Sequence, residues 1–515
     1  MNKKLNKYFY QFLKINKKII KNYKSSKGNM FIIDRGRFNP AINNSIVAAS
    51  INQKYKLNIV VISDEHKDSN ILKIFKSFGC NNFIIGFRYN IIFKNIWMLL
   101  CAIFLTIKSI YLINTKSWLY FIQEFNIENV KIGDLIYDSY TRYEKRYLKP
   151  KTDLYCINIL FTSIYKCLNL LSYFRKYSPK FVIIGTQSYA SNSGICLKIC
   201  CYKKIKVFEP YFANFDQEYR LRTYDQKKLE YGYQNRHDPD FKKFIKKNKK
   251  SEKKINNFLK KRLQGNIITG LTGVQDLQFA YSSKVILTKK KLLEALNIDN
   301  KIIKKIVLFA PHAFSDAPHG RGSFFIFRDY FAQFTETLEF INKKKYKDIL
   351  WIVKPHPTSI YIYGENGIVR DFIKKTNNPM IQLCPQNLNT GNLIDICDLV
   401  VTGCGTIGLE AATRGKTSII AGGAPYSGLG VSLEHKNKKR YFERLLNFEK
   451  ILKLKKTKIM LAKKTLYYFD TKKIELRESK ILDQNVRSSS FNFNNMKANI
   501  KKQREDIDIF NKRLI

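Results

Sequence analysis

Residues 398–430 read DLVVTGCGTIGLEAATRGKTSIIAGGAPYSGLG, and this stretch decides the fold of the second half of the chain. It predicts a short buried strand, a glycine turn, an amphipathic helix, a second strand and a second glycine-rich turn. A glycine turn that leads into a helix directs backbone N–H groups at one point, which suits an anionic phosphate. We therefore expect a phosphate site where the first of these strands ends.

A second loop supports this site. The sequence KPHP at residues 354–357 follows another apolar strand, residues 348–353. The two prolines fix φ and exclude helix, so His356 projects from a stiff loop, where a cationic or hydrogen-bond-donating side chain suits a phosphate oxygen. The alternative is a loop histidine that only bonds to backbone. Together, the two loops predict a nucleotide-phosphate site at the carboxyl ends of parallel strands.

The turn itself supplies hydroxyl groups, bare backbone and a helix start. Glu410, one turn into that helix, is placed to reach ribose hydroxyls, as acidic residues do in dinucleotide sites. The alternative is a packing turn with Glu410 on a solvated face. The residues that we expect to bind a donor nucleotide are Lys354, His356, Thr402, Gly403, Gly405, Thr406 and Glu410.

The loop at residues 311–320 follows the strand at 306–310 and carries two of the six histidines with a carboxylate and a serine. A His/Asp pair on one loop suits general acid–base work, so we predict catalytic roles for Asp316 and His312. Two alternatives remain: a metal site that also uses His319, which we do not favour, and a polar turn that caps the next helix at 329–340.

Two strand ends in the first half carry polar residues. Asp34 and Arg35 follow one strand, and Gln187 follows another. In a parallel sheet such residues collect at one edge, and they are our candidates for the acceptor side. The alternative is ordinary loop chemistry. Patterns of P-loops, G-x-S-x-G elbows and H-E-x-x-H zinc helices do not occur in the chain, which disfavours kinases, serine hydrolases and metalloproteases.

Alternation of short apolar runs with helical stretches predicts an α/β protein with parallel, helix-covered sheets. A chain of 515 residues exceeds what one core usually serves, so two domains are expected. We predict an N-terminal domain at 1–285 with a helical insertion at about 91–174, a C-terminal domain at 286–450, and helices with a weakly ordered tail at 451–515. The predicted strands are 30–33, 57–63, 82–86, 181–185, 204–208, 306–310, 349–353, 380–383, 398–401 and 417–421.

The chain is strongly basic, with 92 Lys+Arg against 41 Asp+Glu and a formal charge of +51. Coding bias that spreads lysine over solvated faces explains this charge, and attraction to an anionic membrane surface is the alternative that we retain. We expect no nucleic-acid partner, because lysine far outnumbers arginine and no aromatic stacking motif is visible.

The ten cysteines lack zinc or CxxC spacing and predict reduced thiols in a cytoplasmic protein. The basic N-terminus lacks the apolar core of a secretion signal. The longest uncharged apolar run, residues 96–107, is too short to span a bilayer and predicts a buried or interfacial helix. We therefore expect a cytoplasmic enzyme, with attachment to the inner face of the cytoplasmic membrane as the peripheral alternative.

Taken in order, the loop of His312 and Asp316, the KPHP motif and the turn from Thr402 to Glu410 resemble the capsule-polysaccharide biosynthesis glycosyltransferases. This bacterial group includes Kdo transferases and is similar to polysialyltransferases. The resemblance covers roughly residues 300–450 and implies a GT-B fold, with two Rossmann-like domains facing across a cleft and the donor held by the second. It also implies that His356 contacts the donor phosphate, that Thr402 and Thr406 line the same pocket, and that Glu410 holds the ribose.

The function that we expect is transfer of a sugar from a nucleotide-activated donor to a growing capsular or other surface polysaccharide, or to a lipid-linked glycan. A CMP-sugar is favoured, with UDP- and GDP-sugars as alternatives, and no cofactor is expected. Other functions left open are those of a polyol-phosphate transferase, a nucleotide-sugar epimerase and a non-catalytic basic binding protein. Only the paired motifs favour the transferase, since a fold by itself does not imply a function.

Overall fold

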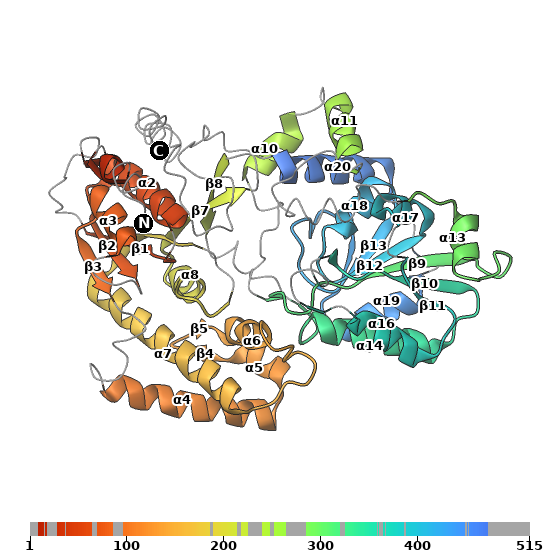
Figure 1. Cartoon of the computed structure of the whole chain (residues 1–515), viewed down its shortest axis with the longest axis horizontal. Helices are drawn as coiled ribbons and strands as arrows, with labels where there is room; N and C mark the ends of the chain where they lie inside the picture. The colour runs from red at the N-terminus through yellow and green to blue at the C-terminus, as the bar shows by residue number, and fades with distance from the viewer. Residues whose placement is uncertain are drawn as a thin grey trace. The chain divides into compact units, whose positions relative to one another are not determined.

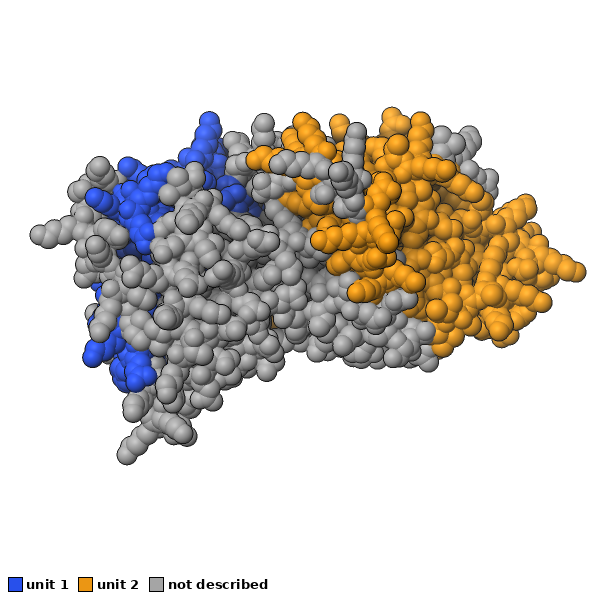
Figure 2. All heavy atoms as spheres, turned by 90° about the horizontal axis from the view of Figure 1, so that it is seen from above, with its two compact units in different colours: residues 1–137, 152–226, 473–515 blue, residues 138–151, 227–472 orange. Residues whose placement is uncertain are grey.

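The structure, a computed structural model, describes most of the chain. The described residues are 9–14, 16–17, 28–36, 38–63, 69–85, 96–185, 189–213, 218–224, 239–247, 252–263, 285–319, 325–357, 359, 364–365, 367–385, 388–448, 451 and 453–471. They fold into two compact units, coloured separately in Figure 2. Unit 1 contains residues 1–137, 152–226 and 473–515, and unit 2 contains residues 138–151 and 227–472.

Unit 1 is built on a six-stranded sheet in the order β3-β2-β1-β6-β7-β8. All neighbouring strands are parallel except β7 and β8, which are antiparallel. From β1 the chain adds strands first on one side, as β2 and β3, and then on the other, as β6, β7 and β8. The boundary between β1 and β6 is therefore the switch point of a doubly wound sheet. The strands are β1 (Asn29–Ile33), β2 (Asn58–Ser63), β3 (Asn82–Ile85), β6 (Pro179–Ile183), β7 (Lys206–Ala213) and β8 (Glu218–Tyr224).

Helices cover both faces of this sheet because its strands are apolar on both sides. Met30 and Ile32 of β1 pack in the core formed with α2 (Phe38–Tyr55) and α3 (Asn70–Ser77). Phe31 points the other way and makes edge-to-face contact with Phe174 of α7 (Leu154–Tyr177) at 5.3 Å between ring centroids. The helix α8 (Asn192–Tyr202) lies beside α7.

The predicted helical insertion is present between β3 and β6. It comprises α4 (Ile96–Thr115), α5 (Trp118–Glu124), the short antiparallel pair β4 (Asn126–Ile127) and β5 (Val130–Lys131), α6 (Gly133–Thr141) and α7. The apolar helix runs eight residues beyond the sequence-based limit of 107, since Lys108 is tolerated on its surface. Half of the residues of α4 are exposed and only four are buried, so the alternative of a buried helix is wrong for it.

Unit 2 repeats the same strand order, β11-β10-β9-β12-β13-β14, but all six of its strands are parallel. Its strands are β9 (Lys305–Ala310), β10 (Ile349–Val353), β11 (Ile381–Leu383), β12 (Leu399–Thr402), β13 (Thr417–Ile420) and β14 (Leu433–Glu434). The switch point lies between β9 and β12. The predicted α/β class with mostly parallel sheets is therefore confirmed in both units.

Side chains along the strands of unit 2 alternate between two cores. Phe309, Trp351 and Val401 belong to the core on the side of α14, α16 and α19, whereas Leu308 and Ile352 belong to the core on the side of α13 and α17 (Figure 1). Apolar side chains on both faces are typical of a parallel sheet with helices on each side. The helices are α13 (Lys289–Ala295), α14 (Tyr330–Lys344), α16 (Ile368–Thr376), α17 (Thr390–Ile396), α18 (Ile407–Thr413) and α19 (Lys438–Leu446).

The two units do not follow the predicted domain limits. The helices α10 (Pro239–Lys247) and α11 (Glu252–Leu263), placed by sequence in the first domain, pack on α20 (Lys456–Thr471) in unit 2. Ile255 and Leu259 of α11 share a core with Leu409 of α18 and Leu466 of α20. The segment 138–151, also assigned to the first domain, belongs to unit 2.

Candidate active site

Three loops of unit 2 leave the carboxyl ends of neighbouring strands. The loop with His312 follows β9, the KPHP loop follows β10, and the glycine turn follows β12. Since β10 and β12 flank β9 on either side, the three loops lie side by side at the switch point of the sheet. In doubly wound sheets, ligands bind at this position.

The centre of the site is a stack of three rings from these elements. The ring of His356 lies on that of His312, with centroids 4.9 Å apart and planes 18° apart. The other face of His312 lies against Tyr330, at 4.4 Å and 15°. Tyr330 is the first residue of α14, whose N-cap Asp329 accepts a hydrogen bond from the Ala332 backbone N–H. The two predicted histidines are therefore brought together by a tyrosine that the sequence analysis did not select.

Tyr330 also connects the stack to the glycine turn. Its hydroxyl lies 2.8 Å from the Cys404 sulfur atom. A Cβ atom on Gly403 would lie 2.9 Å from the Tyr330 ring, so only glycine fits beside this ring without displacing it. The stack and the turn thus form one continuous surface that runs from His356 through Tyr330 to Cys404.

The two predicted threonines have different surroundings. The Thr402 side chain is buried and its hydroxyl donates to the Ala310 carbonyl at 2.8 Å, which ties the end of β12 to the end of β9. Thr406 is the N-cap of α18 and makes no side-chain capping bond. No described residue accepts a hydrogen bond from the backbone N–H of Thr406 or Ile407. The exit of the turn therefore offers backbone donors, as expected for an anion site.

Close packing fixes the shape of the turn. A Cβ atom on Gly405 would lie 3.0 Å from the Thr402 hydroxyl, and one on Gly408 would lie 2.3 Å from the Tyr426 hydroxyl. Tyr426 in turn donates to the Gly405 carbonyl at 2.7 Å. The second glycine-rich segment, residues 422–430, thus supports the first through this tyrosine.

The predicted acid–base pair lies beside the stack. The Asp316 carboxylate is 3.8 Å from Nδ1 of His312, and its second oxygen accepts from the Ala317 backbone N–H at 2.9 Å. The Asp316 side chain is 31% exposed and that of His312 is 17% exposed, so the pair borders solvent. The carboxylate is therefore accessible to a bound molecule while it remains within reach of the imidazole.

The environment of His356 keeps it uncharged. Burial is the main cause and the neighbouring His312 the second of a pKa lowered to about 3, whereas Asp316 opposes the shift. At neutral pH the imidazole is therefore uncharged, and it can offer an N–H donor but not a cation. Of the two roles predicted for this side chain, the structure favours hydrogen-bond donation.

A buried glutamate that the sequence did not reveal supports the loop after β9. Glu365 accepts hydrogen bonds from the backbone N–H groups of Phe314 and Ser315 at 2.9 and 2.7 Å, and from the Ser315 hydroxyl at 2.7 Å. Lys354, the first residue of KPHP, donates its backbone N–H to the Phe309 carbonyl at 2.9 Å and has a partly exposed side chain. These bonds hold the histidine loops in place.

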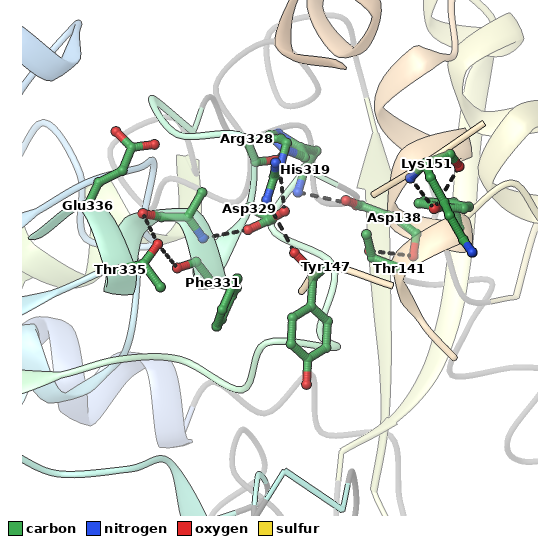
Figure 3. Close-up of polar contacts among 12 residues, drawn as sticks. Asp138, Thr141, Tyr147, Lys151, His319, Arg328, Asp329, Phe331, Thr335 and Glu336 are labelled. Carbon is green, nitrogen blue, oxygen red and sulfur yellow. Dashed lines mark hydrogen bonds and ion pairs between the residues drawn. The ribbon is translucent and has the colours of Figure 1, made fainter. Parts of the chain in front are cut away.

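Residues 138–151 support the same loop from a distant part of the sequence. The Asp138 carboxylate accepts from the His319 backbone N–H at 3.2 Å, and Arg142 donates to the Ser315 carbonyl at 3.2 Å. Figure 3 shows Asp138, His319 and Tyr147 around the Arg328 side chain, which donates to the Tyr147 carbonyl. The Tyr147 ring packs on Phe314.

His319 does not join the other histidines as a metal ligand. Its Nε2 atom lies 2.9 Å from the Arg328 carbonyl oxygen. Within the described part of the chain, no group of three His, Cys, Asp or Glu side chains is arranged to hold a metal ion. The alternative of a metal site through His312, Asp316 and His319 therefore finds no support in the described residues.

Glu410, predicted to hold ribose, forms a buried ion pair. Its carboxylate accepts from Arg262 of α11 at 2.7 Å, and both side chains are almost inaccessible to solvent. Two buried opposite charges stabilise each other when paired, and loss of one leaves the other at high free energy. Glu410 therefore fixes α11 against α18, and its ribose contact stays a prediction.

The acceptor-side candidates lie in unit 1, after β1. The Asp34 carboxylate is buried and accepts from the backbone N–H groups of Arg35 and Gly36 and from the Ser63 hydroxyl. Arg35 is exposed, and its side chain lies over Gly185, where a Cβ atom would lie 2.0 Å from Arg35 Cδ. Gln187 lies outside the described residues. Asp34 therefore shapes its own loop, and the acceptor role of all three stays a prediction.

Comparison with known proteins identifies the second half of the chain. Residues 295–468 match the family described as capsule polysaccharide biosynthesis protein. This match covers most of unit 2, including the histidine loops, the glycine turn and Glu410. No curated protein matches the chain.

Several solved structures are similar at low levels. The beta Kdo 2,4 transferase KpsC of Thermosulfurimonas dismutans has 12% identity and a TM-score of 0.30 over 57% of this chain and 85% of that one. A glycosyltransferase from Rickettsia africae has 12% identity and a TM-score of 0.26 over 93% and 99%. The MnaA–UDP structure from S. aureus has 10% identity and a TM-score of 0.25 over 85% and 91%.

These TM-scores are too low to support an argument on fold or function, so the assignment depends on the family match. That match falls on the segment that carries the predicted motifs. The predicted resemblance to the capsule-polysaccharide biosynthesis family is therefore confirmed by a family match over residues 295–468.

Proposed function

We propose that this chain transfers a sugar from a nucleotide-activated donor to a growing capsular or other surface polysaccharide, or to a lipid-linked glycan. The observation that carries the proposal is the stack of His356, His312 and Tyr330 beside the glycine turn at the switch point of unit 2. The family match over the same residues supports it.

The donor phosphate would lie between His356 and the start of α18. In this position it accepts hydrogen bonds from the neutral imidazole and from the backbone N–H groups of Thr406 and Ile407. The side chain of Lys354 adds positive charge at the edge of the site. These groups are set in place before the reaction, so they stabilise the charge that develops on the departing nucleotide.

The reaction that fits these groups is a displacement at the anomeric carbon. The oxygen of an acceptor hydroxyl forms a bond to this carbon, while the bond from the carbon to the nucleotide phosphate oxygen breaks with its electron pair. The nucleotide leaves with the negative charge. We assign the removal of the hydroxyl proton to Asp316, with His312 at 3.8 Å as the group that positions the carboxylate.

We favour a CMP-sugar as donor, because the resemblance to Kdo transferases implies one, and we retain UDP- and GDP-sugars as alternatives. We place the reaction in the cytoplasm. No disulfide joins the ten cysteines, all of which lie in described residues, in keeping with a reducing compartment. Glu410, Thr402 and Gly405 would shape the nucleotide pocket by supporting the turn.

The test combines nucleotide binding with product analysis. The purified chain is titrated with CMP, UMP, UDP and GDP, and then incubated with the corresponding sugar donors and a panel of glycan acceptors. We expect one nucleotide to bind and one donor to be consumed with formation of a glycosidic product. His356→Ala removes a donor to the leaving phosphate and should lower turnover by about 100-fold or more.

The matched control is His435→Gln, because His435 is a histidine of unit 2 that packs against Tyr441 outside the stack. It should leave turnover unchanged. Conversion of a donor to its epimer without an acceptor would replace the proposal with an epimerase. Absence of nucleotide binding and turnover with every donor, in a chain that is folded by circular dichroism, would overturn it.

A further inference from the structure

The surface of α4 in unit 1 carries an apolar stripe of large side chains. Trp97 is 74% exposed, Phe104 66% and Tyr111 64%. With 3.6 residues per turn, the exposed large side chains of this helix all fall on one face, within about 120° of arc. The apolar stripe consists of Ile96, Trp97, Leu100, Ile103, Phe104, Ile107 and Tyr111.

The opposite face of α4 carries mostly small side chains, two of them polar, although it faces the protein. Its buried residues are Ala102, Thr106, Ser109 and Ile113. The hydroxyls of Thr106 and Ser109 donate to carbonyls one turn earlier in the same helix, at 2.7 Å each. The inner face therefore packs on α7 with its polar groups satisfied, and turning the helix over would bury large side chains where small ones fit. The outward direction of the apolar stripe is thus a property of the fold.

The charge around the apolar stripe has one sign. The sequence contains no Asp or Glu between Asp68 and Glu124, whereas Lys108 and Lys116 are exposed on α4 and directly after it. A second copy of this chain would carry the same formal charge of +51, and repulsion between like charges disfavours pairing of two copies. A nucleic acid would match the charge but not the large apolar side chains. An anionic lipid surface matches both.

We propose that α4 docks unit 1 on a bilayer leaflet that contains anionic phospholipid, with the apolar stripe inserted at the boundary between head groups and acyl chains. The helix packs against α7, and Figure 1 shows the two helices meeting at an angle. The 20 residues of α4 give it a length of about 30 Å. Tryptophan and tyrosine near its two ends are the side chains favoured at this boundary.

The orientation follows from the packing of α4. Both α4 and α7 are long and apolar enough to cross a bilayer by length and composition. A crossing, however, would remove α4 from α7 and expose Thr106 and Ser109 to lipid. An in-plane helix keeps its inner face on the protein. This inference does not rest on the proposed transfer reaction, because it concerns another unit and its test needs no donor.

The test is sedimentation of the full chain with vesicles of phosphatidylcholine containing 30% phosphatidylglycerol, compared with vesicles of phosphatidylcholine alone. We expect binding to the anionic vesicles. The double variant Phe104→Glu/Ile107→Glu should reduce this binding at least tenfold, since it replaces two inserted apolar side chains with carboxylates.

The matched control is Ile302→Glu/Leu446→Glu, which makes the same change in charge at exposed apolar positions of unit 2. This control should bind as the native chain does. Equal loss in both variants, equal binding to both kinds of vesicle, or no binding would overturn the proposal. A dimer of the native chain in light scattering that is monomeric in the α4 variant would also overturn it, because the apolar stripe would then be a contact between copies. Resistance of the bound chain to carbonate extraction would overturn it as well, because α4 would then span the bilayer.

A second measurement does not depend on how well the α4 variant folds. Trp97 is exposed in the described structure, so vesicles should shift its fluorescence to shorter wavelength. Trp97→Phe should abolish this shift, whereas Trp118→Phe should preserve it. A shift that survives Trp97→Phe would contradict insertion at this end of the helix.

Discussion

The two units share one topology but use its switch point in different ways. In unit 1 the carboxylate after the first strand, Asp34, is buried and accepts three hydrogen bonds from its own surroundings. In unit 2 the corresponding loop carries Asp316 at the solvent border beside a stack of aromatic and imidazole rings. The sheet provides the same edge in both units, and the loop residues alone decide whether this edge stabilises a turn or offers reactive groups.

A second contrast concerns what covers each unit. The glycine turn of unit 2 is supported by a buried charge pair between α18 and α11, whereas the insertion of unit 1 presents an apolar helix to the outside. Unit 2 is thus organised around a small polar site, and unit 1 around an extended surface. Three predictions test this division, beginning with the largest expected effect.

The buried pair in unit 2 provides the strongest test. Arg262→Ala leaves the Glu410 carboxylate buried without its cation, and should lower the free energy of unfolding by about 3–5 kcal/mol. Urea denaturation followed by circular dichroism measures this loss. Lys261→Ala, an exposed neighbour on α11, should change stability by about 0.5 kcal/mol or less.

A compensating double variant separates support from ribose binding. Arg262→Met/Glu410→Met replaces the pair with apolar side chains and should recover much of the stability lost in Arg262→Ala. If Glu410 also holds ribose, nucleotide affinity stays low in this double variant. Full affinity would limit Glu410 to its structural role, and failure to recover stability would argue against the pair as the main contact.

The two carboxylates at the switch points should respond in opposite ways. Asp34→Ala removes the acceptor of three hydrogen bonds in unit 1 and should lower the free energy of unfolding by about 1–3 kcal/mol, with donor hydrolysis in the absence of an acceptor unchanged. Asp316→Asn keeps the bond from the Ala317 N–H and should preserve stability. Its turnover should fall by about 100-fold or more, because the base is lost.

Comparison of the two variants in both assays checks the contrast directly. A turnover defect in Asp34→Ala without loss of stability would place a functional carboxylate in unit 1. Full turnover in Asp316→Asn would remove Asp316 from the chemistry and leave His312 as the remaining candidate. Either result would contradict the assignment of a structural role to Asp34 and a catalytic role to Asp316.

Loss of stability on acidification below pH 6.5 should arise mainly in unit 2. The pKa of His356 is lowered to about 3 and that of His435 to about 4, both mainly by burial, against about 6.5 in an unfolded chain. Below pH 6.5 the unfolded state binds protons that the folded state does not. Stability therefore falls as the pH drops from 6.5, by about 1.4 kcal/mol per pH unit for each histidine.

His356→Gln tests this dependence because glutamine does not titrate. Denaturation at pH 7.5, 6.5 and 5.5 should show that the variant loses less stability on acidification than the native chain. Of the six histidines only His66 falls in unit 1, so a transition assigned to unit 1 should move little over this range. An unchanged slope in the variant would show that His356 titrates normally in the folded state.

Local sequence was sufficient to predict ten strands of the two sheets, but not the edge strands β8 and β14. Each predicted strand coincides with an observed one to within a few residues, because strands buried on both faces are continuous apolar runs that end at a polar or turn residue. The placement of α10 and α11 was not predictable in this way. Their lysine-rich pattern indicates a solvated helix, whereas their position depends on contacts with α20, about 200 residues later.

The candidate site shows the same limit. Histidine between two prolines and glycines before a helix are local signals. They selected His356 and the turn, which the contacts of His312 and Tyr330 connect, while the roles of these residues stay predictions. Tyr330, Glu365 and Arg262 carry no local signal, since their importance depends on a ring contact or hydrogen bond across the fold. Residues 138–151 could not be assigned to unit 2 because the flanking sequence on both sides belongs to unit 1.

Residues 138–151 belong to unit 2, although the chain before and after them belongs to unit 1, and this affects how unit 2 folds. A fragment that begins at residue 227 would lack the ring contact of Tyr147 with Phe314. It would also lack the hydrogen bonds that Arg142 and Asp138 make with the loop of His312. On the ribosome this segment emerges well before the strands that receive it. Unit 2 therefore has to complete its assembly around a part of the chain made earlier, and truncation at residue 227 would remove contacts that its histidine loop uses.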